Sequence, residues 1–337
     1  MGKFFALLFL SFVVIFLINL IWTLTNLYYF AVDGFQTLFV GHTLVDNVYF
    51  SIYLKWILLL DFSYWICVLI FMVVRKNYKS DIDLHYLKNY KIEEPKITVV
   101  IPTFNEEKAI EKTIKDYKRQ EYVNQVLIID NKSTDNTVDI AEKCGAVIVK
   151  KERNLGYGHS TLMGLEEGLK TDSNIIVMTE ADCTYEANDM KKFVQYLEHA
   201  DLVTGTRSSQ VLNEKGNQNS RLHNWGNYFL AKLIQLKFIN LGHLGTELTD
   251  VGCGFLAVRK TALSKVIEKL KMHDTQKPVW SVGMRLYFQL QIIENDLRLI
   301  EIPVSFKKRT GQSKIGSLNK PTSIRIGLLF LWLILRY

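Results

Sequence analysis

The sequence predicts an α/β domain with a mainly parallel sheet, preceded by a pair of apolar helices that cross a membrane. Two long apolar runs lie near the start of the chain. From residue 96 onward, short β-branched runs alternate with amphipathic stretches, which is typical of repeated βαβ units. These patterns divide the 337 residues into a two-helix anchor (1–78), a linker (79–95), a globular domain (96–318) and a C-terminal apolar segment (319–337).

The two apolar runs predict a transmembrane hairpin. Phe4 to Leu24 is long enough to cross a bilayer as a helix, and Trp56 to Val74 is expected to form a second span. The second run contains one ionisable residue, Asp61, near enough to one end to reach an interface. A cleaved signal peptide is the alternative for the first run, but its apolar part is too long and no small-residue cleavage site follows.

Basic residues set the expected orientation of the hairpin. The loop between residues 25 and 53 contains no Lys or Arg, whereas Arg75, Lys76 and Lys79 follow the second run. Positive residues favour the cytoplasmic side. We therefore expect an integral membrane protein, in the plasma membrane if the cell is prokaryotic, with its globular domain (96–318) in the cytoplasm. Anionic headgroups explain the net charge of +7, so no nucleic-acid partner is needed.

Apolar patterns place seven strands and the helices around them. The expected strands are Ile97–Ile101, Val126–Asp130, Ala146–Val149, Ile175–Thr179, Leu202–Thr204, Gly254–Val258 and Leu299–Val304. The expected helices are Glu106–Lys118, Thr134–Lys143, His159–Lys170, Glu186–His199, Arg221–Phe238, Thr261–Leu270 and Val282–Glu294. Ser133 or Thr134 is a plausible cap for the second helix. Gln210 to Asn219 is expected to be a mobile polar loop. Ile324 to Leu335 is apolar but short, so it would lie in the interface or begin a span.

Acidic and amide side chains follow three of the expected strands. They are Asn105, Glu106 and Glu107 after the first strand, Asp130, Asn131 and Asp135 after the second, and Glu180 and Asp182 after the fourth. Ligands bind at the carboxyl ends of the strands in an open parallel sheet. Each group alone could be a helix cap, a turn or a solvated acid. Together they predict a ligand site, because carboxylates that face one another need a cation or a donor.

Glu180 and Asp182 are the expected metal ligands. Two carboxylates one residue apart at a strand end can point the same way and offer hard oxygen ligands to Mg²⁺ or Mn²⁺. Other coordination positions would remain for a pyrophosphate. The ion would neutralise the charge that builds on a departing nucleoside diphosphate.

These motifs resemble those of the family 2 glycosyltransferases, most nearly the dolichyl- or polyprenyl-phosphate sugar transferases. The resemblance covers roughly residues 97–316. It implies the GT-A fold, a Rossmann-like fold of nucleotide-diphospho-sugar transferases, and it places Glu180 and Asp182 on the family's Asp-x-Asp metal motif. Donor-binding roles carried over by the resemblance fall on Pro102, Thr103, Asn105, Glu106, Asp130, Ser133, Asn154, Gly156, Arg207, Arg309, Ser313 and Lys314.

Five positions depart from the family pattern. Asn131 and Lys132 stand where the second-strand signature usually has Asp and Gly, and Glu180 replaces the first Asp of the metal motif. Thr184 replaces a frequent Gln, and Cys253 replaces a Ser. Glu180 still presents a carboxylate, so metal binding remains expected. The departures leave the identity of the sugar and of the base open.

The resemblance implies an inverting transfer from a UDP- or GDP-sugar to a dolichyl or undecaprenyl phosphate. The expected catalytic residues are Asp182, Asp250 and Arg207. A phosphate acceptor is already an anion and needs no base, whereas a hydroxyl acceptor does, and Asp250 is then the candidate base or else a turn residue. Arg207, Arg309 and Lys314 would offset the donor's charge, although the last two could instead meet lipid headgroups.

Other interpretations stay open at this point. Transfer to a lipid hydroxyl or a surface polysaccharide is the alternative reaction, but the Gln-x-x-Arg-Trp motif usual in long processive synthases is missing. A non-catalytic nucleotide-sugar-binding membrane protein could lose the acidic pair that this chain retains. A dehydrogenase would need a complete Gly-x-Gly-x-x-Gly fingerprint. The Gly-x-Gly motif at Gly156 and Gly158 is not followed by the third glycine.

Overall fold

The computed structural model describes residues 11, 13–25, 27–29, 31–32, 52–74, 89–238, 246–275, 277–311 and 320–336. Two compact units make up the chain: residues 1–77 with 335–337, and residues 78–334. The second unit contains the whole of the expected catalytic domain.

Helices form the described part of the N-terminal unit. Residues 13–25 are helical, and α3 spans Ile52–Val74. The Asn19 amide donates a hydrogen bond to the Asp61 carboxylate, so Asp61 has a partner inside this unit. Within the described stretches, no helix reaches the combination of length and hydropathy that a bilayer crossing demands. The transmembrane hairpin therefore stays a prediction, and residues 1–10 and 33–51 of it lie outside the described residues.

A seven-stranded sheet in the order β3-β2-β1-β4-β6-β5-β7 forms the centre of the larger unit. The strands are β1 (Ile97–Thr103), β2 (Val123–Asp130), β3 (Val147–Lys150), β4 (Ile175–Met178), β5 (Leu202–Thr206), β6 (Leu256–Arg259) and β7 (Leu299–Pro303). All neighbouring pairs are parallel except those of β6, which runs antiparallel to β4 and β5. The mainly parallel α/β sheet is thus confirmed.

The helices agree with the expected ones to within a few residues. They are α5 (Ile110–Lys118), α6 (Thr137–Lys143), α7 (Tyr157–Lys170), α8 (Met190–Tyr196), α9 (Arg221–Phe238), α10 (Lys260–Lys271), α11 (Pro278–Glu294) and α12 (Lys320–Arg336). The predicted start of α6 at Thr134 is wrong. Ser133 and Thr134 do not cap this helix, because it begins at Thr137 and the residue before it is Asn136. Their hydroxyls instead accept hydrogen bonds from Asn105. The predicted loop from Gln210 contains a short 3₁₀ turn, Gln210–Leu212.

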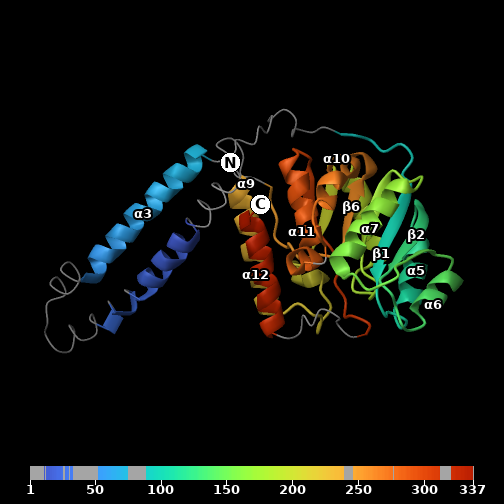
Figure 1. The fold of residues 1–337 in the computed structure, drawn as a ribbon, viewed down its shortest axis with the longest axis horizontal. Helices are drawn as coiled ribbons and strands as arrows, with labels where there is room; N and C mark the ends of the chain where they lie inside the picture. Colours follow the sequence, from blue (N-terminus) through green and yellow to red (C-terminus); the bar gives the residue numbers. More distant parts are fainter. Residues whose placement is uncertain are drawn as a thin grey trace. The chain divides into compact units, whose positions relative to one another are not determined.

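Helices cover both faces of the sheet (Figure 1). On one face, Val99 belongs to a buried cluster with Ile114 of α5 and Phe193 of α8. On the other face, α7 packs so closely that a Cβ on Gly164 would lie 2.4 Å from a methyl carbon of Val100. Because both faces are covered, a ligand can approach the sheet at the ends of its strands.

Candidate active site

The acidic pair Glu180 and Asp182 follows the fully buried strand β4. Asp182 is 1% exposed, and its Oδ1 accepts hydrogen bonds from the Thr184 amide (3.1 Å) and hydroxyl (2.6 Å). Its Oδ2 lies 3.0 Å from Arg309 Nη1. Glu180 Oε1 lies 3.4 Å from Arg285 Nη1. Arginines from much later in the chain therefore flank both carboxylates.

Glu180 and Asp182 are close enough for the charge of one to disfavour ionisation of the other. Burial, and after it the like charge of Asp182, raises the pKa of Glu180, against the opposing pull of Arg285, Arg309 and Arg207. A metal cation bound at the pair would add to the effect of these arginines and favour the ionised form of both acids. Among the described residues, no group of three or more His, Cys, Asp or Glu side chains is placed to hold a metal ion. Any ion at the pair would need further ligands from a bound molecule or water.

Two cavities meet at the acidic pair, since Glu180 and Asp182 line both of them. The first, here called the sheet-edge cavity, has a volume of about 290 Å³ and is bounded by the ends of β1 and β2, the start of α7 and Arg309. The second, the helix cavity, measures about 330 Å³ and lies among α9, α11 and α12. The acidic pair therefore lies where the two cavities adjoin.

Several predicted donor-binding residues line the sheet-edge cavity. They are Pro102, Thr103, Glu106, Asn154, Gly156 and Arg309. Arg309 connects two strand ends, because its Nη2 lies 2.7 Å from Glu106 Oε1 and its Nη1 contacts Asp182. The structure thus brings together residues from the ends of β1 and β4 with a segment that follows β7.

Three further predicted donor residues, Asn105, Asp130 and Ser133, are joined by hydrogen bonds and line neither of these two cavities. The Asn105 amide donates to Ser133 Oγ at 3.0 Å, and the Ser133 amide donates to Asp130 Oδ1 at 3.1 Å. Asn131, one of the departures from the family pattern, lines the sheet-edge cavity instead and donates to Asn154 Oδ1 at 2.6 Å. Ser313 and Lys314 lie outside the described residues.

Arg207 and Asp250 form a buried ion pair beside the helix cavity. Arg207 Nε lies 2.7 Å from Asp250 Oδ2, and its Nη2 lies 2.8 Å from Oδ1. Burial would raise the pKa of Asp250, but the adjacent Arg207 outweighs this effect, so the pKa is lowered. Arg207 lines the helix cavity, whereas Asp250 lines neither cavity. Asp250 therefore orients Arg207, and both of its carboxylate oxygens are engaged.

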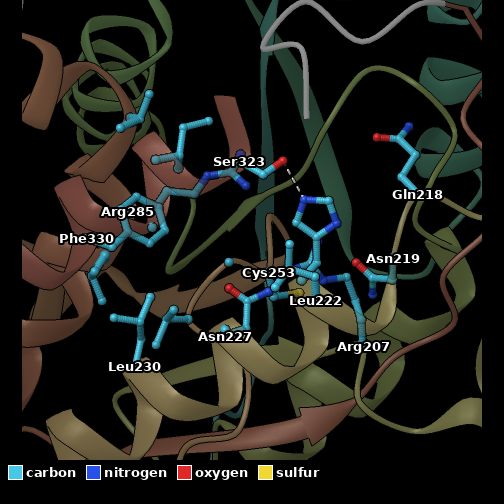
Figure 2. A pocket seen from close by; sticks show the side chains of 18 of the residues that line it. Arg207, Gln218, Asn219, Leu222, Asn227, Leu230, Cys253, Arg285, Ser323 and Phe330 are labelled. Carbon is cyan, nitrogen blue, oxygen red and sulfur yellow. Dashed lines mark hydrogen bonds between the residues drawn. The ribbon is translucent and has the colours of Figure 1, made fainter. Parts of the chain in front are cut away.

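The helix cavity combines apolar walls with a polar end. Figure 2 shows Leu222, Leu230 and Phe330 around the same space as Arg207 and Arg285. The dashed line in Figure 2 marks the 2.8 Å hydrogen bond between His223 Nε2 and Ser323 Oγ, which joins α9 to α12. The apolar walls come from α9 and α12, and the acidic pair is at the polar end. Such a cavity suits a ligand with a charged group and a hydrocarbon part.

Tyr157, Ser281 and Arg285 also line the cavities, and sequence reasoning missed them. Two of them lie on α11, a helix that shows mainly as apolar in the sequence. Two glycines could have located them in the sequence, Gly156 just before α7 and Gly158 within it, because both lie against α11. A Cβ on Gly158 would lie 2.1 Å from the Trp280 carbonyl oxygen, so this glycine lets α7 and α11 meet at the site.

Comparison with known proteins assigns the class. The sequence model of "Glycosyl transferase family 2" matches residues 98–267, from β1 into α10. The chain belongs to this family, and it is a glycosyltransferase with an α/β GT-A fold.

Its relatives include proteins named for lipid-linked sugar transfer. An uncharacterized protein of Methanocaldococcus jannaschii is 31% identical over 54% of this chain and 72% of its own length. A dolichyl-phosphate hexose transferase of Haloferax volcanii is 27% identical over 65% of this chain and 86% of its own. An undecaprenyl-phosphate mannosyltransferase of Micrococcus luteus is 22% identical over 66% and 88%, respectively.

Proposed function

We propose that this glycosyltransferase moves a sugar from a UDP- or GDP-sugar to a polyprenyl phosphate at a membrane surface. The observation that carries the proposal is the position of Glu180 and Asp182. They line both a sheet-edge cavity that several polar side chains share and a helix cavity with apolar walls. Two substrates, one in each cavity, would meet at this pair. The names of the Haloferax and Micrococcus relatives support a polyprenyl-phosphate acceptor.

The donor is proposed to occupy the sheet-edge cavity. Thr103, Glu106, Asn131 and Asn154 line the cavity where the nucleoside would lie, and Arg309 would offer charge for the diphosphate. The loop residues Asn105, Asp130 and Ser133 would act by holding these walls in place. Ser313 and Lys314 are proposed to bind the donor phosphates on the basis of the family resemblance alone.

A divalent ion, Mg²⁺ or Mn²⁺, fits the acidic pair. Burial, and after it the like charge of Asp182, raises the pKa of Glu180, and a bound cation would oppose this rise by favouring the ionised carboxylate. Both carboxylates line the same cavities. Glu180 and Asp182 would hold the ion, and a donor diphosphate would complete its ligands. When bound, the ion supplies neutralisation of charge on the departing nucleoside diphosphate.

The residues of the site favour a direct displacement. An oxygen of the acceptor phosphate forms a bond to the anomeric carbon while the bond from that carbon to the donor diphosphate breaks. The electron pair leaves with the nucleoside diphosphate, and no proton moves. Arg207, fixed by Asp250, would stabilise negative charge from the helix-cavity side. Because both Asp250 oxygens accept hydrogen bonds from Arg207 and its pKa is lowered, Asp250 is poorly suited to deprotonate a hydroxyl acceptor.

The membrane location of the proposal rests on the sequence. The apolar runs near the N-terminus would anchor the protein, and the basic residues after them would leave the catalytic unit in the cytoplasm. A lipid acceptor has its phosphate at the bilayer surface, so an anchored enzyme would reach it without extracting the lipid.

A donor screen tests the proposed function. The full chain in lipid nanodiscs is incubated with Mn²⁺ and a panel of UDP- and GDP-sugars, with undecaprenyl phosphate, undecaprenol or neither. We expect nucleotide release and a lipid-linked sugar with undecaprenyl phosphate alone, and loss of turnover in Asp182→Ala. Asp172→Ala, an exposed acid paired with Lys96, is the control. Equal transfer to undecaprenol, or full activity in Asp182→Ala, would rule the proposal out.

A further inference from the structure

Arg285 of α11 is a buried cation with unused hydrogen-bond donors. The residue is 6% exposed, and its side chain extends from α11 into the helix cavity (Figure 2). Its Nη1 makes a long contact of 3.4 Å with Glu180, whereas Nε and Nη2 have no hydrogen-bond partner. Burying such donors unpaired is unfavourable. A ligand that accepts from Nε and Nη2 would remove this cost.

Nε and Nη2 form one edge of the guanidinium, and this edge can donate two parallel hydrogen bonds to an oxyanion. Arg207 illustrates this in the same cavity, since its Nε and Nη2 both bond to the carboxylate of Asp250. Both Nη atoms of Arg309 are likewise committed, to Glu106 and Asp182. Arg309 keeps one unpaired donor, Nε, but of these three arginines lining the helix cavity Arg285 alone has both Nε and Nη2 without a partner among the described residues.

The surroundings of Arg285 hold this edge in place. Its guanidinium carbon lies 4.9 Å from the centre of the Tyr157 ring, a cation–π contact. On another side, Gly254 has no side chain, and a Cβ there would lie 2.3 Å from Arg285 Nη1. An arginine fixed in this way can bind an anion without first losing side-chain entropy.

The position of Arg285 distinguishes the two substrates. It lines the helix cavity but not the sheet-edge cavity proposed for the donor. The apolar side chains of α9 and α12 continue from it along the same cavity, Leu230 and Phe330 among them. The anion at Arg285 would therefore belong to a molecule that also carries hydrocarbon.

We propose that the Nε–Nη2 edge of Arg285 binds the phosphate of the acceptor lipid, with the first isoprene units along the apolar walls of the helix cavity. This inference rests on the proposed function. In this arrangement Arg285 holds the acceptor oxyanion next to Glu180 and Asp182, where the donor sugar is expected. Arg285 would thus set the preference for a lipid phosphate over the corresponding alcohol.

Binding of two short lipids of equal chain length tests this inference. Farnesyl phosphate and farnesol are titrated into the full chain in phosphatidylcholine nanodiscs, and UDP and GDP with Mn²⁺ are titrated separately. We expect the wild type to prefer farnesyl phosphate by about tenfold or more. Arg285→Gln should lose that preference while its affinities for farnesol and for nucleotide change less than about twofold, and Arg285→Lys should keep part of it.

The controls separate the inference from the proposed function. Arg298→Gln removes an arginine that pairs with Asp201 and lines neither cavity, so it should bind all probes as the wild type does. Retained nucleotide binding shows that Arg285→Gln is folded. If this variant keeps the phosphate preference, or loses only nucleotide affinity, Arg285 is a counterion for Glu180 and the inference is wrong. If the wild type itself shows no preference, the acceptor assignment fails as well.

Discussion

Gly254 lies next to two side chains of the candidate site, those of Arg285 and Glu180. A Cβ at this position would lie 2.3 Å from both Arg285 Nη1 and Glu180 Oε1. Real Cβ contacts are never this short, so any side chain must push one of the two groups aside. The Gly254 amide is also held in place, because it donates a hydrogen bond to the Tyr185 hydroxyl at 2.7 Å. The glycine is therefore needed for the geometry of the site.

Gly254→Ala should consequently damage activity more than stability. We expect kcat/KM to fall by about 100-fold, the scale of loss that a displacement of about 1 Å can cause in an active site. Overpacking should lower the free energy of unfolding by about 1–3 kcal/mol. Steady-state kinetics and thermal unfolding measure the two effects. Gly226→Ala is the control, because this glycine also lines the helix cavity but a Cβ would meet nothing within 4 Å. Similar kinetics in both variants would contradict the prediction.

Sequence reasoning at this scale located residues better than it assigned their contacts. Glu180, Asp182 and Arg309, which the motifs assign to one site, line the same cavity, and their roles stay predictions. Asn105 and Asp130 also follow strand ends as predicted, but hydrogen bonds use their polar atoms. Asn105 donates to Thr134 of the neighbouring loop, and Asp130 accepts from the Ser133 amide of its own loop. A motif gives the place of a side chain along a strand, whereas the neighbouring loop decides whether its polar atoms remain available. That second factor depends on tertiary structure.

At the scale of elements, strand β7 holds the loop that contains Asp250. Glu301 of β7 accepts hydrogen bonds from the Thr249 amide and hydroxyl, both at 2.7 Å, and from the Asp250 amide at 2.9 Å. Burial raises the pKa of Glu301 to about 7, even though these hydrogen bonds oppose the rise. The connection between β7 and the Arg207–Asp250 pair therefore includes an acid that titrates near neutrality.

This raised pKa gives the stability of the folded chain a defined pH dependence. The folded-state pKa of Glu301 exceeds its ordinary value of 4.5. Its contribution is thus fully present below that value and is lost as the pH rises through about 7. The loss cannot exceed about 1.4 kcal/mol per pH unit. We expect the stability advantage of the wild type over Glu301→Gln to shrink between pH 5 and pH 8.

Thermal unfolding of the full chain in detergent across this pH range measures the effect. Glu301→Gln should be less stable throughout, because an amide cannot accept all three hydrogen bonds. Glu268→Gln, at an exposed position of α10, should differ from the wild type by a constant amount. A constant difference for Glu301→Gln too would show that Glu301 does not titrate in this range.

The elements themselves were largely predictable. All seven strands lie within a few residues of their expected ranges, because short apolar runs between turn residues favour buried strands. The antiparallel direction of β6 was not predicted, since its own residues do not encode which way it pairs. The cavity-lining role of α11 was missed for a related reason. Its buried residues surround the whole helix, so no polar stripe distinguishes the side that carries Arg285.

At the scale of the whole molecule, the site depends on contacts between distant parts of the chain. The ends of β1 and β4 supply Glu106 and Asp182, and Arg309 joins them from beyond β7. The walls of the helix cavity come from α9 and α12, which the His223–Ser323 hydrogen bond connects across 100 positions. Sequence reasoning assigned α12 to the membrane or its interface and could not foresee this pairing. Helix-to-helix packing over such a separation leaves no local pattern in the sequence.

This arrangement predicts that nucleotide and metal stabilise the fold only together. Glu180 and Asp182 repel each other, so a nucleoside diphosphate alone would add negative charge to an acidic site. With Mn²⁺ present, the same nucleotide would connect the ends of β1 and β4 and resist unfolding of the entire sheet. At a nucleotide concentration of 100 times Kd, the gain should be about 2.7 kcal/mol.

Thermal unfolding of the full chain measures this coupling without any need for turnover. UDP or GDP should raise the Tm in Mn²⁺, and the rise should vanish in EDTA and in Asp182→Asn. Asp172→Asn changes an exposed acid next to Lys96 and should respond as the wild type does. Because a loss confined to Asp182→Asn tracks the acidic pair and not the overall charge, the comparison separates a metal-bridged donor from simple anion binding by Arg309. An equal rise in Tm with EDTA present would show that the arginines alone hold the nucleotide.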